Sequence, residues 1–224
     1  MWDEVSVEID PAEGEALGID PVMFWAASKL LMLQKTAAPV AVIDMDFIVW
    51  EMPALSVRPG APVVCAHLEN ISDYTYPHVN YFKMKPDYEF RPQFNYSALP
   101  CNTAFLYIAD ESFKQFYVCH AIEFMRQAEK CDDTLRYMVY AEQRMLAMCA
   151  DFLAYPVRTL LDKDRLFFPQ DKYTHLWGAK QAMREDMGEL VRFCSKCRAR
   201  IVTDFEEYVE VPGLIDRYYE GLVK

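Results

Sequence analysis

The stretch from Pro39 to Trp50 constrains the fold more than any other part of the chain. It reads P-V-A-V-I-D-M-D-F-I-V-W, with five uncharged residues ahead of Asp44 and Asp46. A short, charge-free run rich in Val and Ile predicts a buried strand of a parallel sheet. Ionised carboxylates are almost never buried without a partner, so this pair requires a cation, hydrogen-bond donors or solvent. Ligands of open α/β sheets bind at the carboxyl ends of strands, which makes this turn a candidate site.

The spacing of Asp44 and Asp46 suits a hard divalent cation. Mg²⁺ and Mn²⁺ take oxygen ligands, commonly one or two protein carboxylates together with substrate phosphates. In the alternative interpretation, Asp44 caps a turn and Asp46 is simply solvated. The strongly apolar residues before the pair favour the functional interpretation.

Composition limits the class of protein and its partners. The chain has 224 residues, 53% of them hydrophobic, which is enough for one α/β domain with a substantial core. Its net charge of −11 argues against binding to nucleic acid or to an anionic membrane. Seven scattered cysteines and no signal peptide indicate a cytoplasmic protein. The most apolar run, residues 21–33, contains Ser28 and Lys29 and is too short to span a bilayer, so no transmembrane segment is expected.

Hydrophobic periodicity and capping residues predict a chain that mixes strands and helices. The aromatic, proline-containing segment 70–97 is either a functional loop, whose rings could stack on sugars, or a small satellite core. We expect helices at residues 21–35, 112–130, 134–153 and from 181 onward, and strands at 2–9, 39–43, 63–67, 104–109, 156–161 and 173–177.

Three further motifs follow the aspartate pair along the chain. Asn102-Thr103-Ala104 opens a predicted strand, Glu142-Gln143 lies in a predicted helix, and T-H-L-W-G-A-K spans residues 174–180. Each motif alone has an ordinary interpretation, as a turn residue, a solvated helix face or a surface charge. The combination in this order is more specific than any one of them.

In this order the motifs resemble glycosyltransferases of the GT-A fold. The nearest are a bacterial group similar to the glycogenin-like and the capsule and outer-chain mannosyltransferase-like families. The resemblance covers residues 2–180 and implies an α/β fold with a GT-A-like mixed, mostly parallel sheet flanked by helices. Residues 1–180 would form the transferase domain and 181–224 a C-terminal helical extension of it. Such proteins begin with a strand and a helix ahead of the strand that corresponds to Val5–Ile9, so we expect this chain to lack the usual first strand.

The resemblance also implies roles for individual residues. Asp44, Asp46 and His175 would bind Mn²⁺ or Mg²⁺, and Asp44 would also reach the sugar or the ribose. Glu142 and Gln143 would be the catalytic residues, at the reacting face of the sugar. The other residues that would bind the nucleotide-sugar are Asn102, Thr103, Trp177, Gly178 and Lys180.

The implied activity is metal-dependent transfer of a hexose from a UDP- or GDP-sugar to a glycan or cell-envelope acceptor. The metal would neutralise the diphosphate leaving group, and Lys180 would add a positive charge there. A homodimer, in which the partner is a second copy of the chain, is a further option.

Two alternatives remain open. The first is a non-catalytic GT-A-like module that binds carbohydrate or supports assembly. The second is a haloacid-dehalogenase-like phosphatase with Asp44 as nucleophile and Asp46 as acid and base. That chemistry requires a distal acidic pair after a strand, and the pair in this chain, Asp132-Asp133, lies in a polar link between two predicted helices.

Overall fold

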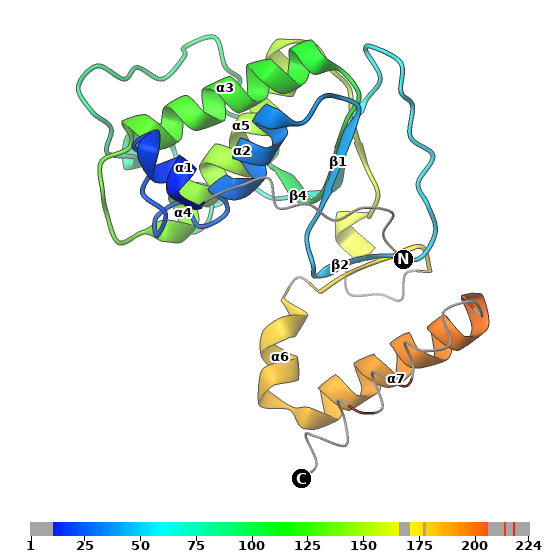
Figure 1. The fold of residues 1–224 in the computed structure, drawn as a ribbon. Coiled ribbons are helices and arrows are strands. Elements are labelled where there is room, and N and C mark those ends of the chain that lie inside the picture. Colours follow the sequence, from blue (N-terminus) through cyan, green and yellow to red (C-terminus); the bar gives the residue numbers. More distant parts are fainter. Residues whose placement is uncertain (1–10, 166–170, 177, 206–212, 214–216, 218–224) are drawn as a thin grey trace. The chain divides into compact units, whose positions relative to one another are not determined.

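A computed structural model describes residues 11–165, 171–176, 178–205, 213 and 217 (Figure 1). The chain divides into two compact units, Met1–His175 and Leu176–Lys224, whereas the sequence analysis places the division after Lys180. The strand predicted at residues 2–9 lies outside the described residues. No helix in the described part of the chain combines the length and the apolar character needed to cross a membrane.

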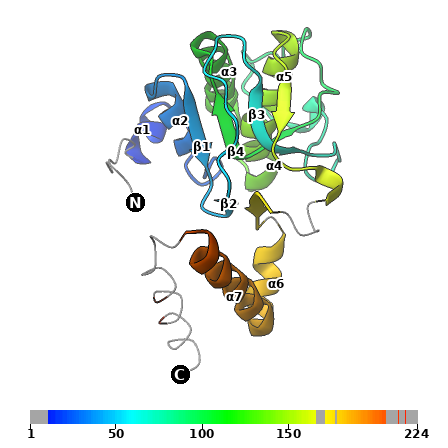
Figure 2. The same cartoon turned by 90° about the vertical axis from the view of Figure 1, so that its right-hand side faces the viewer.

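The first unit is built on a four-stranded sheet with helices packed against it, which confirms the predicted α/β class. The strands lie in the order β1-β4-β3-β5, as Figure 2 shows from left to right. Their bounds are β1 Val40–Ile43, β4 Cys101–Ile108, β3 Val63–Leu68 and β5 Val157–Thr159.

The prediction of a mostly parallel sheet is wrong. The pairs β1–β4 and β3–β4 are antiparallel, and only β3–β5 is parallel. The physical reason lies in the connections. A parallel neighbour needs a crossover, usually a helix, but the segment 69–100 between β3 and β4 contains only the single 3₁₀ turn η1, Val79–Tyr81. The chain therefore returns antiparallel beside β3.

The strand before the aspartates is only partly buried, whereas the sequence predicts a buried strand. Val40 and Val42 are buried, while Ala41 and Ile43 are exposed, so β1 has one covered face. Among the described strands β1 lies at the edge of the sheet. Such alternation is characteristic of antiparallel strands, whereas the continuous burial expected of a parallel strand is found in the central β4.

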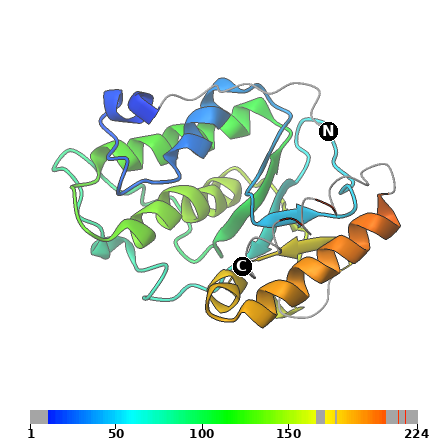
Figure 3. The same ribbon diagram turned by 60° about the horizontal axis from the view of Figure 1, so that its bottom comes forward.

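Helices of the first unit cover one face of this sheet (Figures 1 and 2). The longest, α3, lies beside both α2 and α5, and Figure 3 shows α3 and α5 running side by side. The helices are α1 Pro11–Ala16, α2 Ala27–Lys35, α3 Glu111–Gln127, α4 Thr134–Val139, the π-helix η2 Tyr140–Arg144, α5 Met145–Phe152 and the 3₁₀ turn η3 Lys163–Arg165.

Two of the predicted helices differ from the observed ones in detail. The helix expected from residue 21 begins only at Ala27, because the Asp20 carboxylate accepts the backbone N–H groups of Val22 and Met23 in a preceding turn. The helix expected at 134–153 is present but is interrupted by one π-helical segment, η2.

The opposite face of the sheet carries a second, smaller hydrophobic cluster. It includes Val64 and Ala66 of β3 and Phe105 and Tyr107 of β4. Over this cluster lies a separate two-stranded sheet formed by β2 Phe47–Val49 and β6 Tyr173–His175. Phe47 pairs with His175 across it, so this small sheet joins residues that are far apart in the sequence of the first unit.

The aromatic segment 70–97 does not form a separate satellite core. Of its buried rings, Phe82 and Phe94 belong to the main core, and Tyr88, Phe90 and Tyr96 pack against that core while partly exposed. The segment therefore combines a structural role with a partly exposed aromatic surface.

The second unit contains the helices α6 Ala179–Glu185 and α7 Met187–Asp204. They agree with the helical structure expected beyond residue 181. Neither of these helices has a buried side chain.

Candidate functional site

The two aspartates lie on a tight turn between β1 and β2. The Asp44 N–H donates to the Ala104 carbonyl of β4 at 2.8 Å, and the Phe47 N–H donates to the Asp44 carbonyl at 3.0 Å. Met45, between them, is fully exposed, whereas both aspartates are half-buried. The backbone bonds thus fix a turn that holds both carboxylates at the end of β1.

A lysine that the sequence analysis did not assign to the site lies at its centre. Lys29 of α2 forms an ion pair with Asp44, with its Nζ 2.8 Å from Asp44 Oδ1, and a second ion pair with Glu142. Its Nζ also donates to the Thr103 carbonyl at 3.4 Å. One ammonium group therefore joins three segments that the sequence analysis singled out.

The charge of Lys29 is set by its carboxylate partners against the effect of burial. The Lys29 side chain is 20% exposed and that of Glu142 only 6%. Burial alone would lower the pKa of Lys29, but the carboxylates of Glu142 and Asp44 outweigh burial and raise this pKa. Lys29 is therefore charged at neutral pH, and its charge is what makes a buried Glu142 carboxylate tolerable.

Glu142 and Gln143 lie in the π-helix η2. The Glu142 carbonyl accepts the Tyr117 hydroxyl at 2.9 Å, and Gln143 Oε1 accepts the Tyr76 hydroxyl at 2.6 Å. Apart from the Lys29 ion pair, Glu142 Oε1 has no hydrogen-bond partner among the described residues. Single π turns inside α-helices are frequent at functional sites, because they re-aim side chains that a regular helix would place elsewhere.

Asn102 and Thr103 are buried at the start of β4. The Asn102 side chain donates to Glu69 Oε1 at 3.0 Å and accepts the Ala104 N–H at 3.1 Å, so it fixes the local backbone. Within the described part of the chain, Thr103 Oγ1 has no hydrogen-bond partner although it is buried. A buried hydroxyl of this kind is costly and leaves one bond for a ligand or a water to make.

The strand pairing brings His175 beside the aspartate turn. His175 lies opposite Phe47 in the β2–β6 pair, and its Nδ1 is 3.3 Å from Nε2 of the buried His67. His67 Nδ1 lies 3.2 Å from the Leu68 carbonyl, to which only an N–H can donate. Burial lowers the pKa of His67 against the opposing effect of Glu69, so at neutral pH its Nε2 is an acceptor.

This contact assigns the tautomer of His175. Because His67 Nε2 accepts, His175 Nδ1 carries the proton and donates to it. In the neutral form of His175, the lone pair is then on Nε2. Histidines that bind a metal through one ring nitrogen are usually held in this way through the other.

The predicted metal ligands do not form a complete coordination set here. Among the described residues, no three His, Cys, Asp or Glu side chains lie close enough together to hold a metal ion. Asp44 is already paired with Lys29, which occupies part of its coordination capacity. The residue types fit Mn²⁺ or Mg²⁺, but the binding of a metal by Asp44, Asp46 and His175 stays a prediction.

The last motif lies across the boundary of the two units. Gly178 adopts a φ of +74°, a backbone conformation that favours glycine, and it precedes α6, which contains Lys180. Both belong to the second unit, so their predicted contact with phosphates stays a prediction. Trp177 lies outside the described residues.

One feature of the sequence could have indicated the role of Lys29. Lys29 is the single charge within the apolar run 21–33. A charge in such a run must either face solvent or meet an opposite charge, and here it meets two. The contacts of His67 with His175, of Glu69 with Asn102 and of Tyr76 with Gln143 join residues far apart in sequence, and no local pattern indicated them.

Comparison of this chain with protein-family models, with curated proteins and with solved structures finds no match. The resemblance to glycosyltransferases therefore rests on the sequence motifs alone.

Proposed function

We propose that this protein is a metal-dependent glycosyltransferase of GT-A type, which moves a hexose from a UDP- or GDP-sugar to a glycan or cell-envelope acceptor. The observation that carries the proposal is the cluster at the end of β1. There the Lys29 ammonium pairs with the carboxylates of Asp44 and Glu142. His175 lies on β6, the strand paired with β2. Buried, mutually paired ionisable groups of this kind are concentrated at functional sites.

Each residue of the cluster has a definite role in this proposal. Asp46 and His175 would hold Mn²⁺ or Mg²⁺, which when bound would neutralise the diphosphate leaving group. Lys29 pairs with the carboxylates of Asp44 and Glu142 and fixes their positions. The Glu142 carboxylate would then stabilise the positive charge that develops on the reacting sugar, and Asp44 would accept a hydrogen bond from the sugar or the ribose.

A second candidate is a GT-A-like module that binds carbohydrate or supports assembly without catalysis. Lys29 favours it, because this ammonium already neutralises part of the charge that a divalent ion would neutralise. The phosphatase alternative has less support. Asp133, one member of its required acidic pair, caps α4 and pairs with Arg136 at 2.8 Å, so that carboxylate is committed to the link between α3 and α4.

The test is a thermal-shift titration with UDP, GDP and CDP, each with and without Mn²⁺. A ligand at 100 times its Kd should add about 2.7 kcal/mol to the free energy of unfolding. We expect a Mn²⁺-dependent rise in Tm for one nucleotide that is lost in Asp46→Ala. The matched control Asp73→Ala, at an exposed position away from the turn, should keep the rise.

The other outcomes decide between the candidates. If no nucleotide shifts Tm under any condition, the transferase is excluded and the non-catalytic module remains. Release of phosphate from a phosphomonoester, abolished by Asp44→Asn, would identify the phosphatase instead.

A further inference from the structure

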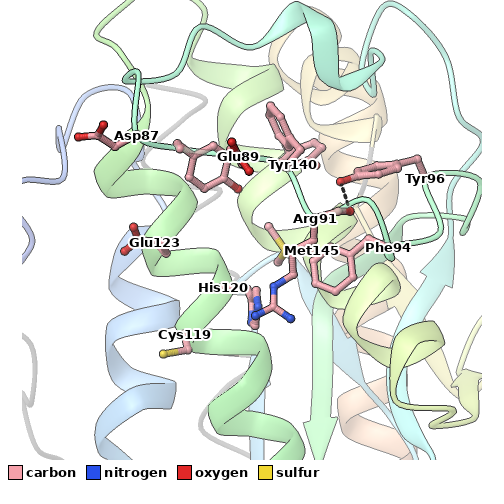
Figure 4. A pocket seen from close by; sticks show the side chains of 12 residues that line it. Asp87, Glu89, Arg91, Phe94, Tyr96, Cys119, His120, Glu123, Tyr140 and Met145 are labelled. Atoms are coloured by element: carbon pink, nitrogen blue, oxygen red, sulfur yellow. Dashed lines mark hydrogen bonds between the residues drawn. The ribbon is translucent and has the colours of Figure 1, made fainter.

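A pocket of about 420 Å³ lies between the segment 87–96 and one side of α3 (Figure 4). Cys119, His120 and Glu123 of α3 form one wall. Tyr140 of η2 and Met145 of α5 also line it. Its volume falls within the range typical of small-molecule sites, which is about 300–1,000 Å³.

This pocket is distinct from the carboxylate cluster described above. Both sites draw on η2, but Tyr140 lines the pocket whereas Glu142 pairs with Lys29. Residues two apart on a helical segment point to different sides, so the two sites lie on different sides of η2. A ligand in the pocket would not compete with one at the aspartate turn.

Aromatic rings form a rigid, partly exposed surface in the pocket. Tyr88 and Phe90 meet edge to face at 5.1 Å between ring centroids, and Phe90 meets Tyr140 in the same way at 6.0 Å. The Tyr96 hydroxyl donates to the Arg91 carbonyl at 2.7 Å, as the dashed line in Figure 4 marks. The pocket is therefore preformed by contacts within the protein, which reduces the entropic cost of binding.

Polar groups surround this aromatic surface. Asp87, Glu89 and Glu123 supply three carboxylates, against a single guanidinium from Arg91. The Arg91 guanidinium lies over the Phe94 ring, 5.9 Å from its centroid, and this holds the group in place. The excess of carboxylates disfavours an anionic ligand, and so many charged groups disfavour a wholly apolar one.

Two tyrosine hydroxyls add unused hydrogen-bonding capacity. Among the described residues, no hydrogen bond is made by the hydroxyls of Tyr88 and Tyr140. Tyr140 is only 1% exposed and lines the pocket. A tyrosine hydroxyl at a pocket wall can both donate to and accept from a ligand or a water.

We propose that this pocket binds one or two rings of an uncharged saccharide. The apolar faces of sugar rings pack on the Tyr88 and Phe90 rings, and sugar hydroxyls donate to the carboxylates of Asp87, Glu89 and Glu123. Arg91 and the tyrosine hydroxyls donate hydrogen bonds to the ring oxygen and the hydroxyl oxygens of the sugar. The site is a carbohydrate-binding site separate from the proposed reaction centre, and it does not depend on whether that centre is catalytic.

The test is saturation-transfer NMR and calorimetry with maltose, cellobiose and N,N′-diacetylchitobiose on the full chain. We expect at least one of these disaccharides to bind. Glu89→Gln and Arg91→Ala, both at exposed rim positions, should each weaken its binding about ten-fold, as expected for loss of a hydrogen bond to a charged group. Glu129→Gln, an exposed glutamate outside the pocket lining, is the matched control and should bind as the wild type does.

Three results would overturn the proposal. These are no binding of any of the three disaccharides, unchanged binding in the double variant Glu89→Gln/Arg91→Ala, or binding of inorganic phosphate in the pocket in place of sugar. The Tm of each variant, measured in parallel, separates loss of binding from loss of folding. Asp46→Ala should bind the disaccharide normally, so failure of the proposed transferase and failure of this pocket give different results.

Discussion

At the scale of single residues, Lys29 sets the chemistry of the candidate site. Among the described residues, it is the one charged side chain that forms ion pairs with both Asp44 and Glu142, and it is largely buried. Its partners come from the turn after β1 and from η2, which are far apart in sequence. Removing one member of a buried ion pair costs more than the pair contributes, because the other charge is left without compensation.

We therefore expect Lys29→Met to lower the free energy of unfolding by about 3 kcal/mol. Urea denaturation measures this change. The matched control is Lys35→Met on the same helix, whose ion pair with Glu13 is much more exposed and should be worth at most about 1 kcal/mol. Adding Glu142→Gln to Lys29→Met should recover part of the lost free energy of unfolding. Equal losses for Lys29→Met and Lys35→Met would show that the buried ion pairs of Lys29 contribute no more than the exposed pair of Lys35.

The buried His67 predicts how stability depends on pH. Burial lowers its pKa below the ordinary value of 6.5, so the unfolded state binds a proton more readily than the folded state. Above pH 6.5 His67 is neutral in both states and does not reduce the free energy of unfolding. As the pH falls from 6.5 through the lowered pKa, this free energy decreases. His67→Gln should reduce the slope of unfolding free energy against pH in this range, as urea denaturation at a series of pH values would measure.

At the scale of elements, local patterns were predictable and distant pairings were not. The helices α3 and α5 follow from apolar periodicity, which is a property of consecutive residues. The direction of β4 relative to β1 and β3 depends on how long connections run, and for this reason the sequence analysis predicted a mostly parallel sheet in error. The π turn in η2 was not visible either, since one turn of altered period is too short to change the pattern.

The same distinction applies to the candidate site. Asp44, Glu142 and Thr103 were singled out from their positions in motifs, and the structure brings them together around Lys29. The sequence alone did not indicate that a lysine joins them, because that contact exists only after α2 packs beside the sheet. A pairing of this type is decided by tertiary packing and leaves no local pattern.

The start of α3 gives a prediction at the element scale. Asp110 caps this helix by accepting the Phe113 N–H at 3.0 Å, and that bond lowers the pKa of the Asp110 carboxyl. Asp110→Ala should cost about 1 kcal/mol in the free energy of unfolding, and Ser112→Ala in the exposed first turn should cost much less. The difference between wild type and Asp110→Ala should shrink as the pH falls through the lowered pKa, because the protonated cap accepts less strongly.

At the scale of the whole molecule, both hydrophobic clusters belong to the first unit. Every buried residue of the main core and of the smaller cluster lies between Ile19 and Tyr173, and α6 and α7 contain none. Hydrophobic burial is the dominant stabilising contribution in folding. Among the described residues, the second unit therefore contributes no side chain to either cluster.

We expect a chain ending at His175 to fold by itself with a cooperative thermal transition. Its Tm should lie within a few degrees of that of the full chain, as measured by circular dichroism. If Gly178 and Lys180 contact the donor phosphates, this shortened chain should keep its fold and lose the nucleotide-dependent rise in Tm. A shortened chain without a cooperative transition would show that the first unit depends on the second.

The pairing of Phe47 with His175 has a consequence for biosynthesis. Translation proceeds at roughly 5–20 residues per second, so the aspartate turn leaves the ribosome on the order of ten seconds before β6 is made. During that interval the nascent chain carries Asp44 and Asp46 without the imidazole that will lie beside them. The site is completed by the last strand of the first unit, so a chain released before Tyr173 contains the aspartates but never the assembled cluster.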